Sequence, residues 1–198
     1  MKTLFNTVLK SSSLAIVLFA SVFSLTASAA TVTINKGAAG WDIKKVIVTG
    51  NTKVLLVQNN QEYVTMEDLD MKKVSVKQTG NTLTINSTES SPVTVTVYVK
   101  DLYRIDASEK ASVRTVGKFN VANLQVMLKD DASARVKANT ESIYTVINDR
   151  ANLELIGKTD KHIYEIAGIA KMDTDKFAAT KSQYTKVYDK AVTFNAKN

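Results

Sequence analysis

Apolar and polar residues alternate with a period of two along much of the chain. Residues 93–99 read Val-Thr-Val-Thr-Val-Tyr-Val, and shorter segments follow the same rule. Such alternation places one set of side chains in a core and the other set in water, which is typical of a β-strand. The pattern therefore predicts an all-β chain, with about seven short strands over residues 30–101.

Turn-forming residues separate these predicted strands. Residues 44–52 resemble residues 72–82, because each stretch runs from a strand into a Gly-Asn pair and out into another strand. Glycine and asparagine tolerate the positive φ angles that tight hairpin turns require. We therefore expect hairpin turns at 50–51 and at 80–81.

A stronger repeat occupies the second half of the chain. Five short segments align on an alanine, and these alanines recur at a near-constant spacing: Ala111, Ala132, Ala151, Ala170 and Ala191. A constant period of this length is the signature of a solenoid, in which each coil stacks on the one before it. The sequence therefore predicts a parallel β-solenoid with coils of about 20 residues.

The alignment also predicts which side chains point inward. The positions six before, four before and two after each alanine are mostly apolar, so we expect them to face the core. The position three after each alanine is charged in the first four repeats and should face outward: Arg114, Arg135, Glu154 and Asp173. We expect Arg135 and Glu154 to form an exposed ion pair worth well under about 1 kcal/mol. The alanine itself marks a corner with room for only a small side chain.

The N-terminal residues contain the three parts of a secretory signal peptide in order. Two early lysines are followed by an apolar stretch at 14–25 and by a small-residue cleavage site at 27–29. The apolar stretch is short for a membrane span, which needs about 20 residues. We therefore expect a cleaved signal peptide at 1–29 and a single mature domain at 30–198 without a membrane span.

Composition and charge exclude several classes of protein. The chain has no cysteine, so its core must hold together without disulfides. Its formal net charge is +7, but acidic and basic residues are interspersed, as on a solvated surface. Nucleic-acid binding would need a basic stripe with stacking aromatic residues, and neither stands out. We therefore predict no nucleic-acid partner and no cofactor.

His162 is the only histidine in the chain. It falls eight residues before Ala170, in a column that is partly apolar. Catalysis would need partners from other residue types at the same place. A half-buried structural histidine is therefore the interpretation that we favour.

Acidic residues recur two positions before the repeated alanines: Glu109, Asp130, Asp149 and Asp189. Stacked carboxylates either repel one another or hold Ca²⁺ between them. Neighbouring cations neutralise most of this column, and no loop has the ligand spacing of a calcium site, so we predict no metal. A polysaccharide lyase also needs acids and a base, and one set would serve: Asp130, Asp131, Asp149 and Arg135. An ordinary solvated corner explains the same residues.

Three tyrosines are candidates for surface contacts. Tyr144 and Tyr184 occupy one column, seven residues before their alanines, with Ile163 between them, and Tyr188 follows nearby. Outward aromatic rings could contact sugar rings or a partner protein. The alternative is that β-strands simply favour aromatic residues on both faces. No catalytic residue is predicted.

Over residues 41–198 the sequence resembles the auto-transporter adhesin (head GIN domain) family of secreted bacterial proteins. The resemblance rests on the repeated corners and on four stretches: 41–43, 80–85, 93–99 and 102–105. It implies a right-handed parallel β-helix and an adhesin-like role. The family usually has glycine-rich corners, whereas Gly168 is the only glycine at a repeated corner here. We therefore expect these corners to avoid positive φ angles.

The sequence thus predicts an exported, non-enzymatic β-solenoid with an adhesin-like or structural role at the cell envelope. It would work in the periplasm, on the cell surface or outside the cell, with an extracellular glycan or protein as partner. The alternatives are a carbohydrate-binding protein and a carbohydrate-active enzyme of the polysaccharide lyase type. An exposed aromatic row favours binding, whereas a deep groove that gathers acids and a base favours an enzyme.

Overall fold

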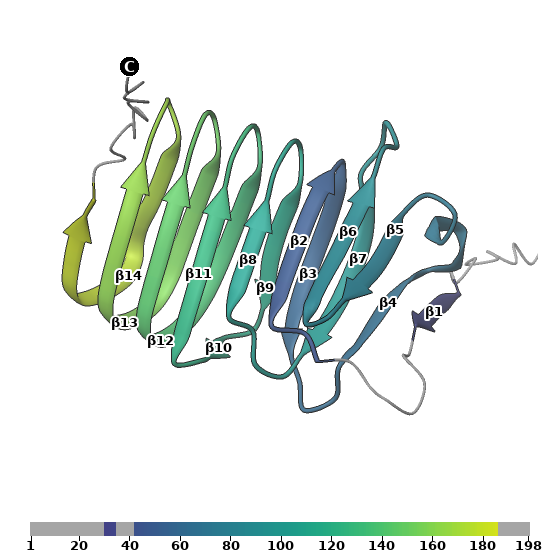
Figure 1. Ribbon diagram of the computed structural model, residues 1–198, viewed down its shortest axis with the longest axis horizontal. Helices are drawn as coiled ribbons and strands as arrows, with labels where there is room; N and C mark the ends of the chain where they lie inside the picture. The colour runs from purple at the N-terminus through teal and green to yellow at the C-terminus, as the bar shows by residue number, and fades with distance from the viewer. Residues whose placement is uncertain (1–29, 35–41, 186–198) are drawn as a thin grey trace, which may run out of the picture.

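β-Strands make up nearly all of the structure, which confirms the prediction of an all-β chain (Figure 1). The computed structural model describes residues 30–34 and 42–185. These residues form fourteen strands and one short 3-10 helix, η1 (Asp68–Asp70). No helix among them has the length and apolar composition of a membrane span. The predicted signal peptide at 1–29 and the repeat corner at Ala191 lie outside the described residues.

Seven strands lie in the region where about seven were predicted: β1 (Thr31–Ile34), β2 (Lys45–Gly50), β3 (Thr52–Gln58), β4 (Tyr63–Glu67), β5 (Ser75–Thr79), β6 (Thr82–Ser87) and β7 (Val93–Val99). The second half of the chain forms seven more: β8 (Arg104–Ala107), β9 (Ser112–Val116), β10 (Phe119–Asn120), β11 (Asn123–Leu128), β12 (Ser133–Ile147), β13 (Asn152–Ile166) and β14 (Lys171–Tyr184).

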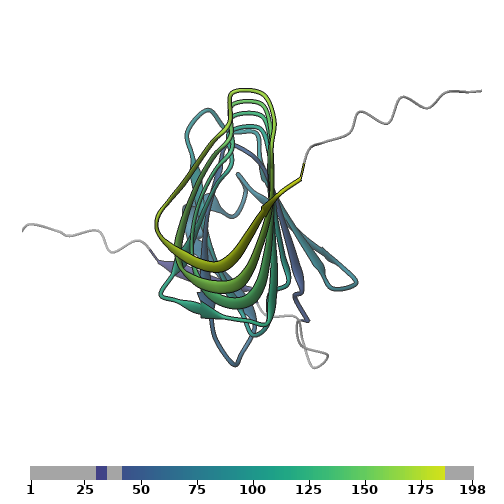
Figure 2. The same cartoon turned by 90° about the vertical axis from the view of Figure 1, so that its left-hand side faces the viewer.

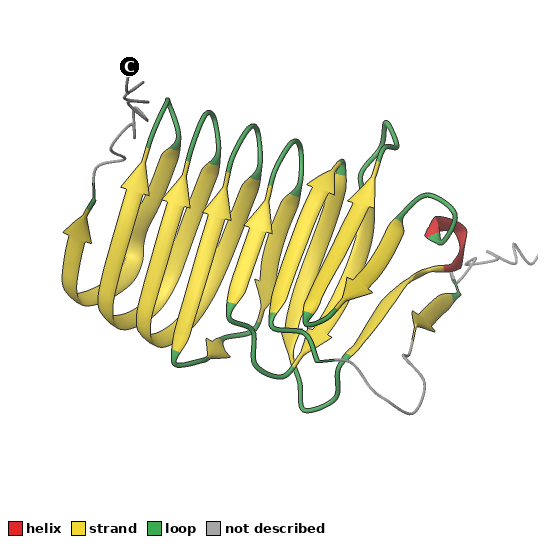
Figure 3. Cartoon of the chain, in the orientation of Figure 1, coloured by secondary structure: helices red, strands yellow, loops and turns green. Residues whose placement is uncertain are grey.

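Two rows of strands enclose one apolar core (Figure 2). In spatial order, the first row contains β5, β6, β2, β8, β11 and the second halves of β12, β13 and β14. The second row contains β1, β4, β7, β3, β9 and the first halves of the same three long strands. The chain crosses from the first row to the second at short corners, which line one edge of the molecule (Figure 3). Pairing is antiparallel in only three of the described strand pairs: β1–β4, β4–β7 and β5–β6.

The register of the described strands pairs residues that the sequence alignment places at equivalent positions. Ile105 on β8 pairs with Val126 on β11, which pairs in turn with Thr145 on β12 and, through it, with Tyr164 on β13. These are the residues that the alanine alignment placed in one column. A bulge between Glu154 and Ile156 then interrupts the pairing of β13 with β14. The bulge adds one residue to β14, whereas the alignment on Ala191 implied two, so this part of β14 lies one position away from its predicted register.

The predicted inward columns are buried through three coils. The corner residues Ala111, Ala132 and Ala151 are 0% exposed, so the corners do hold only a small side chain. The three columns around them are also buried: Ile105, Val126, Thr145, Ala107, Leu128, Ile147, Val113, Ala134 and Leu153. In the next coil the corresponding residues are only partly buried, among them Tyr164 and Met172.

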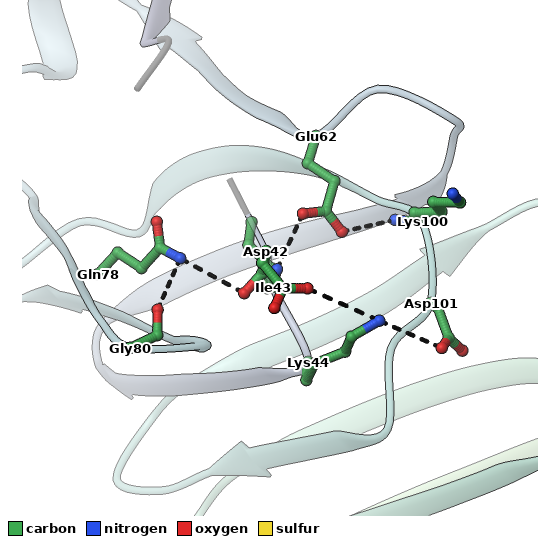
Figure 4. Close-up of polar contacts among 8 residues, drawn as sticks. All are labelled: Asp42, Ile43, Lys44, Glu62, Gln78, Gly80, Lys100 and Asp101. Carbon is green, nitrogen blue, oxygen red and sulfur yellow. Dashed lines mark hydrogen bonds and ion pairs between the residues drawn. The ribbon is translucent and has the colours of Figure 1, made fainter. Parts of the chain in front are cut away.

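The strands are not stacked in sequence order. β2 lies between β6 and β8, and β3 lies between β7 and β9, so these early strands occupy the interior of the stack. Glu62, between β3 and β4, forms hydrogen bonds that hold its segment against the start of β2 (Figure 4). Its carboxylate accepts the backbone N–H of Ile43 at 2.9 Å and that of Lys100 at 3.0 Å. Lys44 adds an ion pair with Asp101 at 3.2 Å, so several polar contacts hold the crossing of the chain in place.

The two Gly-Asn pairs have different roles. The pair at 80–81 joins β5 to β6 in an antiparallel hairpin, as predicted. The hairpin predicted at 50–51 is wrong, because Gly50 turns the chain from β2 in the first row to β3 in the second. Gly50 has a φ of 69°, and a Cβ atom there would lie 2.0 Å from the carbonyl oxygen of Ser87. The close approach of the neighbouring coil therefore requires glycine at this corner.

The repeated corners adopt positive φ angles, contrary to the prediction that they avoid them. The φ angles of Glu109, Asp130 and Asp149 are 60°, 58° and 60°, and Gly168 has a φ of 70°. The register of β2 with β8 aligns Gly50 with this column. The five described corners of this column therefore share one left-handed backbone conformation, which costs a non-glycine residue about 1–2 kcal/mol.

Carboxylates of successive coils offset this cost. Asp130 Oδ2 accepts the backbone N–H of Glu109 at 3.0 Å, and Asp149 Oδ2 accepts the N–H of Asp130 at 3.0 Å. Aspartate also enters the left-handed region more readily than most residues, because its short side chain bonds locally to the backbone. The acids at these corners thus share the backbone conformation of Gly50 and Gly168.

Substitutions at Asp149 test this account of the corners. We expect Asp149→Val to lower the free energy of unfolding by about 2–3 kcal/mol, because a β-branched residue is strained at positive φ and the bond to Asp130 is lost. Asp149→Gly loses the same bond but relieves the strain, so its effect should be at most about 1 kcal/mol. Urea unfolding of both variants measures the difference.

Lys171→Val, at the start of β14, is the matched control, because Lys171 is exposed and its side chain forms no hydrogen bond or ion pair found among the described residues. It should change stability by no more than about 0.5 kcal/mol. Equal losses for Asp149→Val and Asp149→Gly would contradict a strained left-handed corner.

Candidate functional site

The predicted tyrosine column is only partly assembled. Tyr144 lies on the outer face of β12, partly buried, and its hydroxyl donates a hydrogen bond to the carboxylate of Glu165 on β13. This bond, together with burial and the negative charge of Glu165, raises the pKa of Tyr144 to about 12. Tyr144 is therefore anchored to the neighbouring strand.

Contrary to the prediction, Tyr184 does not continue the column of Tyr144. Because of the bulge in the pairing of β13 with β14, Tyr184 pairs with Tyr164, while Gln183 takes the place next to Ile163. The rings of Tyr164 and Tyr184 lie 5.5 Å apart, and Tyr184 is 49% exposed. Tyr188 lies outside the described residues, so its contact role stays a prediction.

A shallow, partly apolar hollow lies near Tyr144 on the outer face of the first row. Ile47, Met127 and Val146 line it, beside the charged pair Arg104 and Asp106. Asp106 is held by two cations, Lys45 Nζ at 2.7 Å and Arg104 Nε at 2.7 Å. This face therefore offers apolar contact area next to charges that already have partners.

His162 is buried more deeply than the half-buried position that was predicted. It is 3% exposed, and its Nε2 lies 3.0 Å from the hydroxyl of Thr145. The rings of Tyr164 and Phe177 pack against it at 5.0 Å and 5.5 Å. Burial lowers the pKa of His162, so the neutral form is favoured in the folded protein.

Asp130, Asp131 and Asp149, the acids of the lyase-like set, are engaged in hydrogen bonds. The carboxylates of Asp130 and Asp149 accept backbone N–H groups, as described above, and Arg150 forms a two-point bond with Asp131 at 2.6 and 2.7 Å. This hydrogen bond holds the pKa of Asp131 below its usual value. No group of three or more metal-ligating side chains comes together within residues 30–34 and 42–185.

The basic residue of the lyase-like set lies elsewhere. Arg135 forms an ion pair with Glu154 at 3.2 Å on the outer face of the second row, which confirms the predicted pair. It does not line the surface hollow that Asp130 and Asp131 share with Arg150. The acids and the base of that alternative are therefore not gathered around one substrate position.

A line of cations crosses the second row of strands, and the sequence analysis missed it. Each of β3, β9, β12 and β13 carries one exposed cation, and from each strand to the next this cation lies two residues further along the strand. The four residues are Lys53, Arg114, Lys137 and Lys158. We call these four residues the cation diagonal. The spacing of strands and residues puts neighbouring Cα atoms about 8 Å apart. None of the ion pairs found among the described residues involves these four cations.

The backbone shapes a shallow hollow along this diagonal. The ladder between β9 and β12 ends where Arg114 faces Arg135, and the hydroxyl of Thr115 then accepts the N–H of Lys137 at 2.8 Å. Gly117, with a φ of 80°, lies in the bend between β9 and β10, where the pairing with β12 is interrupted before it resumes at Phe119. The resulting hollow is lined by cations and by three apolar side chains, Leu55, Val116 and Ile156.

The comparisons with known proteins agree on one family. The family described as "Putative auto-transporter adhesin, head GIN domain" matches residues 42–188. This range contains thirteen of the fourteen described strands, β2 to β14. Among curated proteins, none matches the chain.

Solved structures resemble this fold at low sequence identity. A "putative adhesin" from Bacteroides fragilis NCTC 9343 is 12% identical, with a TM-score of 0.65 over 80% of this chain and 77% of that chain. A "putative lipid binding protein" from Parabacteroides distasonis ATCC 8503 is 12% identical, with a TM-score of 0.59 over 81% and 79%. A "putative adhesin" from Parabacteroides merdae ATCC 43184 is 12% identical, with a TM-score of 0.54 over 81% and 78%. At this identity the likeness concerns the fold alone.

The bond between Tyr144 and Glu165 predicts a loss of stability at alkaline pH. The pKa of Tyr144 is about 12 in the folded protein, above the usual value of about 10 expected when unfolded. Its contribution to stability is therefore complete below about pH 10 and is lost as the pH rises through about 12. Urea unfolding between pH 9 and pH 12, roughly the span of these two values, should show a smaller loss for Tyr144→Phe than for the unaltered chain.

Tyr103→Phe is the matched control, since Tyr103 is 46% exposed and has no bond to a carboxylate in the described structure. It should follow the unaltered chain throughout. A Tyr144→Phe variant with the same alkaline loss as the unaltered chain would contradict the bond to Glu165.

Proposed function

Because the chain belongs to the head GIN domain family of adhesin-like proteins, we propose that it is an exported, non-enzymatic binding protein of the cell envelope. Its partners would be glycans or proteins in the periplasm, at the cell surface or outside the cell. The match to residues 42–188 carries this proposal, because it spans nearly the whole stack of strands and not one motif within it.

We also propose that the stack is a right-handed parallel β-solenoid that forms one domain at 30–198, after removal of a signal peptide at 1–29. Parallel pairing at a near-constant sequence separation from coil to coil supports the solenoid. Parallel crossover connections are right-handed in nearly all proteins, which supports the handedness. The composition of residues 1–29 supports the signal peptide.

Binding through a rigid face is the mode of action that the geometry favours. The outer side chains of each row are held at fixed spacing, since each strand is bonded to its neighbours along its length. The first row offers a partly apolar hollow near Tyr144, and the second row offers the cation diagonal. Such faces need no moving parts to recognise a partner, which limits the entropy lost on binding.

A carbohydrate-binding role is the second candidate. The 49% exposure of Tyr184, next to the ring of Tyr164, favours it, because exposed aromatic rings suit the apolar faces of sugars. The lyase alternative has less support, since the corner carboxylates bond to backbone N–H groups and Arg135 is paired with Glu154.

A binding screen that also detects turnover tests the proposal. The protein, expressed from the full 198-residue sequence, is exposed to immobilised polysaccharides and extracellular-matrix proteins with and without calcium. We expect saturable binding to at least one target, independent of calcium, and no release of new sugar ends. Release of sugar ends would contradict a non-enzymatic role, and the absence of binding to every target would contradict an adhesin-like one.

A further inference from the structure

The cation diagonal brings together positive charges that the chain keeps apart in sequence. Lys53 comes from β3 and Arg114 from β9, while Lys137 and Lys158 come from β12 and β13. All four side chains are exposed and point away from the core. With neighbours about 8 Å apart, the four charges span about 24 Å along one line.

The placement of Arg114 is unfavourable for the fold alone. Its direct partner across the strands is Arg135, and its partner on the other side is Leu55. Like charges directly opposite each other in a sheet are destabilising. Glu154 neutralises Arg135 from the far side, but no described carboxylate pairs with Arg114. The guanidinium of Arg114 is therefore available to an anion from outside the chain.

The surroundings of the diagonal indicate which kind of anion fits. The charges follow a line instead of surrounding a pit, so they suit an extended polymer better than a small anion. Leu55, Val116 and Ile156 lie among them, and Val116 is 46% exposed, which provides apolar contact for the faces of sugar rings.

Other polyanions fit this face less well. No aromatic residue among those described lines the hollow, whereas single-stranded nucleic acids are held by stacking on aromatic side chains. Binding to an anionic lipid surface usually adds large apolar anchors such as Trp, Phe or Leu, and the only strongly exposed apolar residue found to line this hollow in the described structure is Val116.

We propose that the cation diagonal is a binding site for a linear acidic polysaccharide, laid across β3, β9, β12 and β13. Carboxylate or sulfate groups of the polymer would pair with Lys53, Arg114, Lys137 and Lys158. This inference rests on the proposed function, since it names the class of partner and the face that binds it.

Affinity measurements with defined polymers test the site. The protein expressed from the full sequence is titrated with polygalacturonate and dextran sulfate, with neutral dextran as the uncharged reference. We expect binding to both acidic polymers, none to neutral dextran, and weaker binding as salt is raised. The double variant Arg114→Gln/Lys137→Gln should bind at least about tenfold more weakly.

A matched variant controls for the loss of two positive charges. Lys72 and Lys77 are exposed, lie on or just before β5 at one end of the first row, and form no ion pair among the described residues. Lys72→Gln/Lys77→Gln should therefore change affinity by less than about twofold. The diagonal variant should stay folded, because losing Arg114 removes its repulsion with Arg135; a thermal unfolding curve checks this.

Three outcomes would contradict the proposed binding site. Equal weakening by the two double variants would mean attraction by net charge alone. Binding as strong to polyglutamate, to a single-stranded oligonucleotide or to phosphatidylserine vesicles would show that the class of partner is wrong. The absence of binding to either acidic polysaccharide would end this inference but leave the proposed function standing if the screen finds another target.

Discussion

Each strand in the stack depends on the neighbouring coil for its backbone hydrogen bonds. Parallel, in-register pairing satisfies these groups from β6 and β7 to β14, and it dictates most other features of the molecule. Side chains at equivalent positions of successive coils must stack on one another. Inward positions therefore form continuous apolar columns, and outward positions form rows of side chains on the surface. A core side chain thus packs between the equivalent side chains of the coils on both sides, which explains why the corner alanines are fully buried.

The same constraint governs the corners. Each coil must turn from one row to the other within a few residues while staying in contact with the coil beside it. A left-handed residue solves this geometry in five successive corners, from Gly50 to Gly168, whereas the corner between β6 and β7 has none. Where that residue is glycine, a Cβ atom would meet the neighbouring backbone, as at Gly50 and Gly168. Where the residue is acidic, hydrogen bonds connect successive corners. The N–H of Glu109 donates to the carboxylate of Asp130, and the N–H of Asp130 donates to that of Asp149.

Much of this architecture could be predicted from the sequence, because the alternation and the alanine spacing record the burial pattern directly. The inward columns, the Arg135–Glu154 pair and the setting of His162 follow from that pattern. Three features did not follow. The left-handed corners were hidden because acids stand where glycine is usual. The place of Tyr184 was missed because the spacing of 21 residues from Ala170 to Ala191, two more than in the two coils before, does not say where the extra residues fall, and the bulge takes up only one of them before Tyr184.

The third missed feature was the cation diagonal, since its members come from segments that only the fold aligns. Lys53 belongs to a corner that reads Gly-Asn-Thr and not acid-x-Ala, so it was not recognised as part of the repeat. The stretch 44–52 is in fact an early copy of the same corner. Aligning it with the later coils would have placed Lys53 two positions short of the column of Arg114, and so would have supplied the first step of the diagonal.

The interior position of β2 and β3 has a consequence for how the chain reaches this structure. Each later coil pairs with the coil that comes next in sequence, whereas Lys45 pairs with Arg104 and Lys53 with Ser112, each much further along the chain. Contacts that close short loops form faster than those that close long ones. Assembly should therefore begin in the C-terminal coils, although the N-terminal half is made first. Until residues 104–116 arrive, β2 and β3 can pair only with β6 and β7, so one edge of each strand stays unpaired. This interval is when the protein is most open to misassembly.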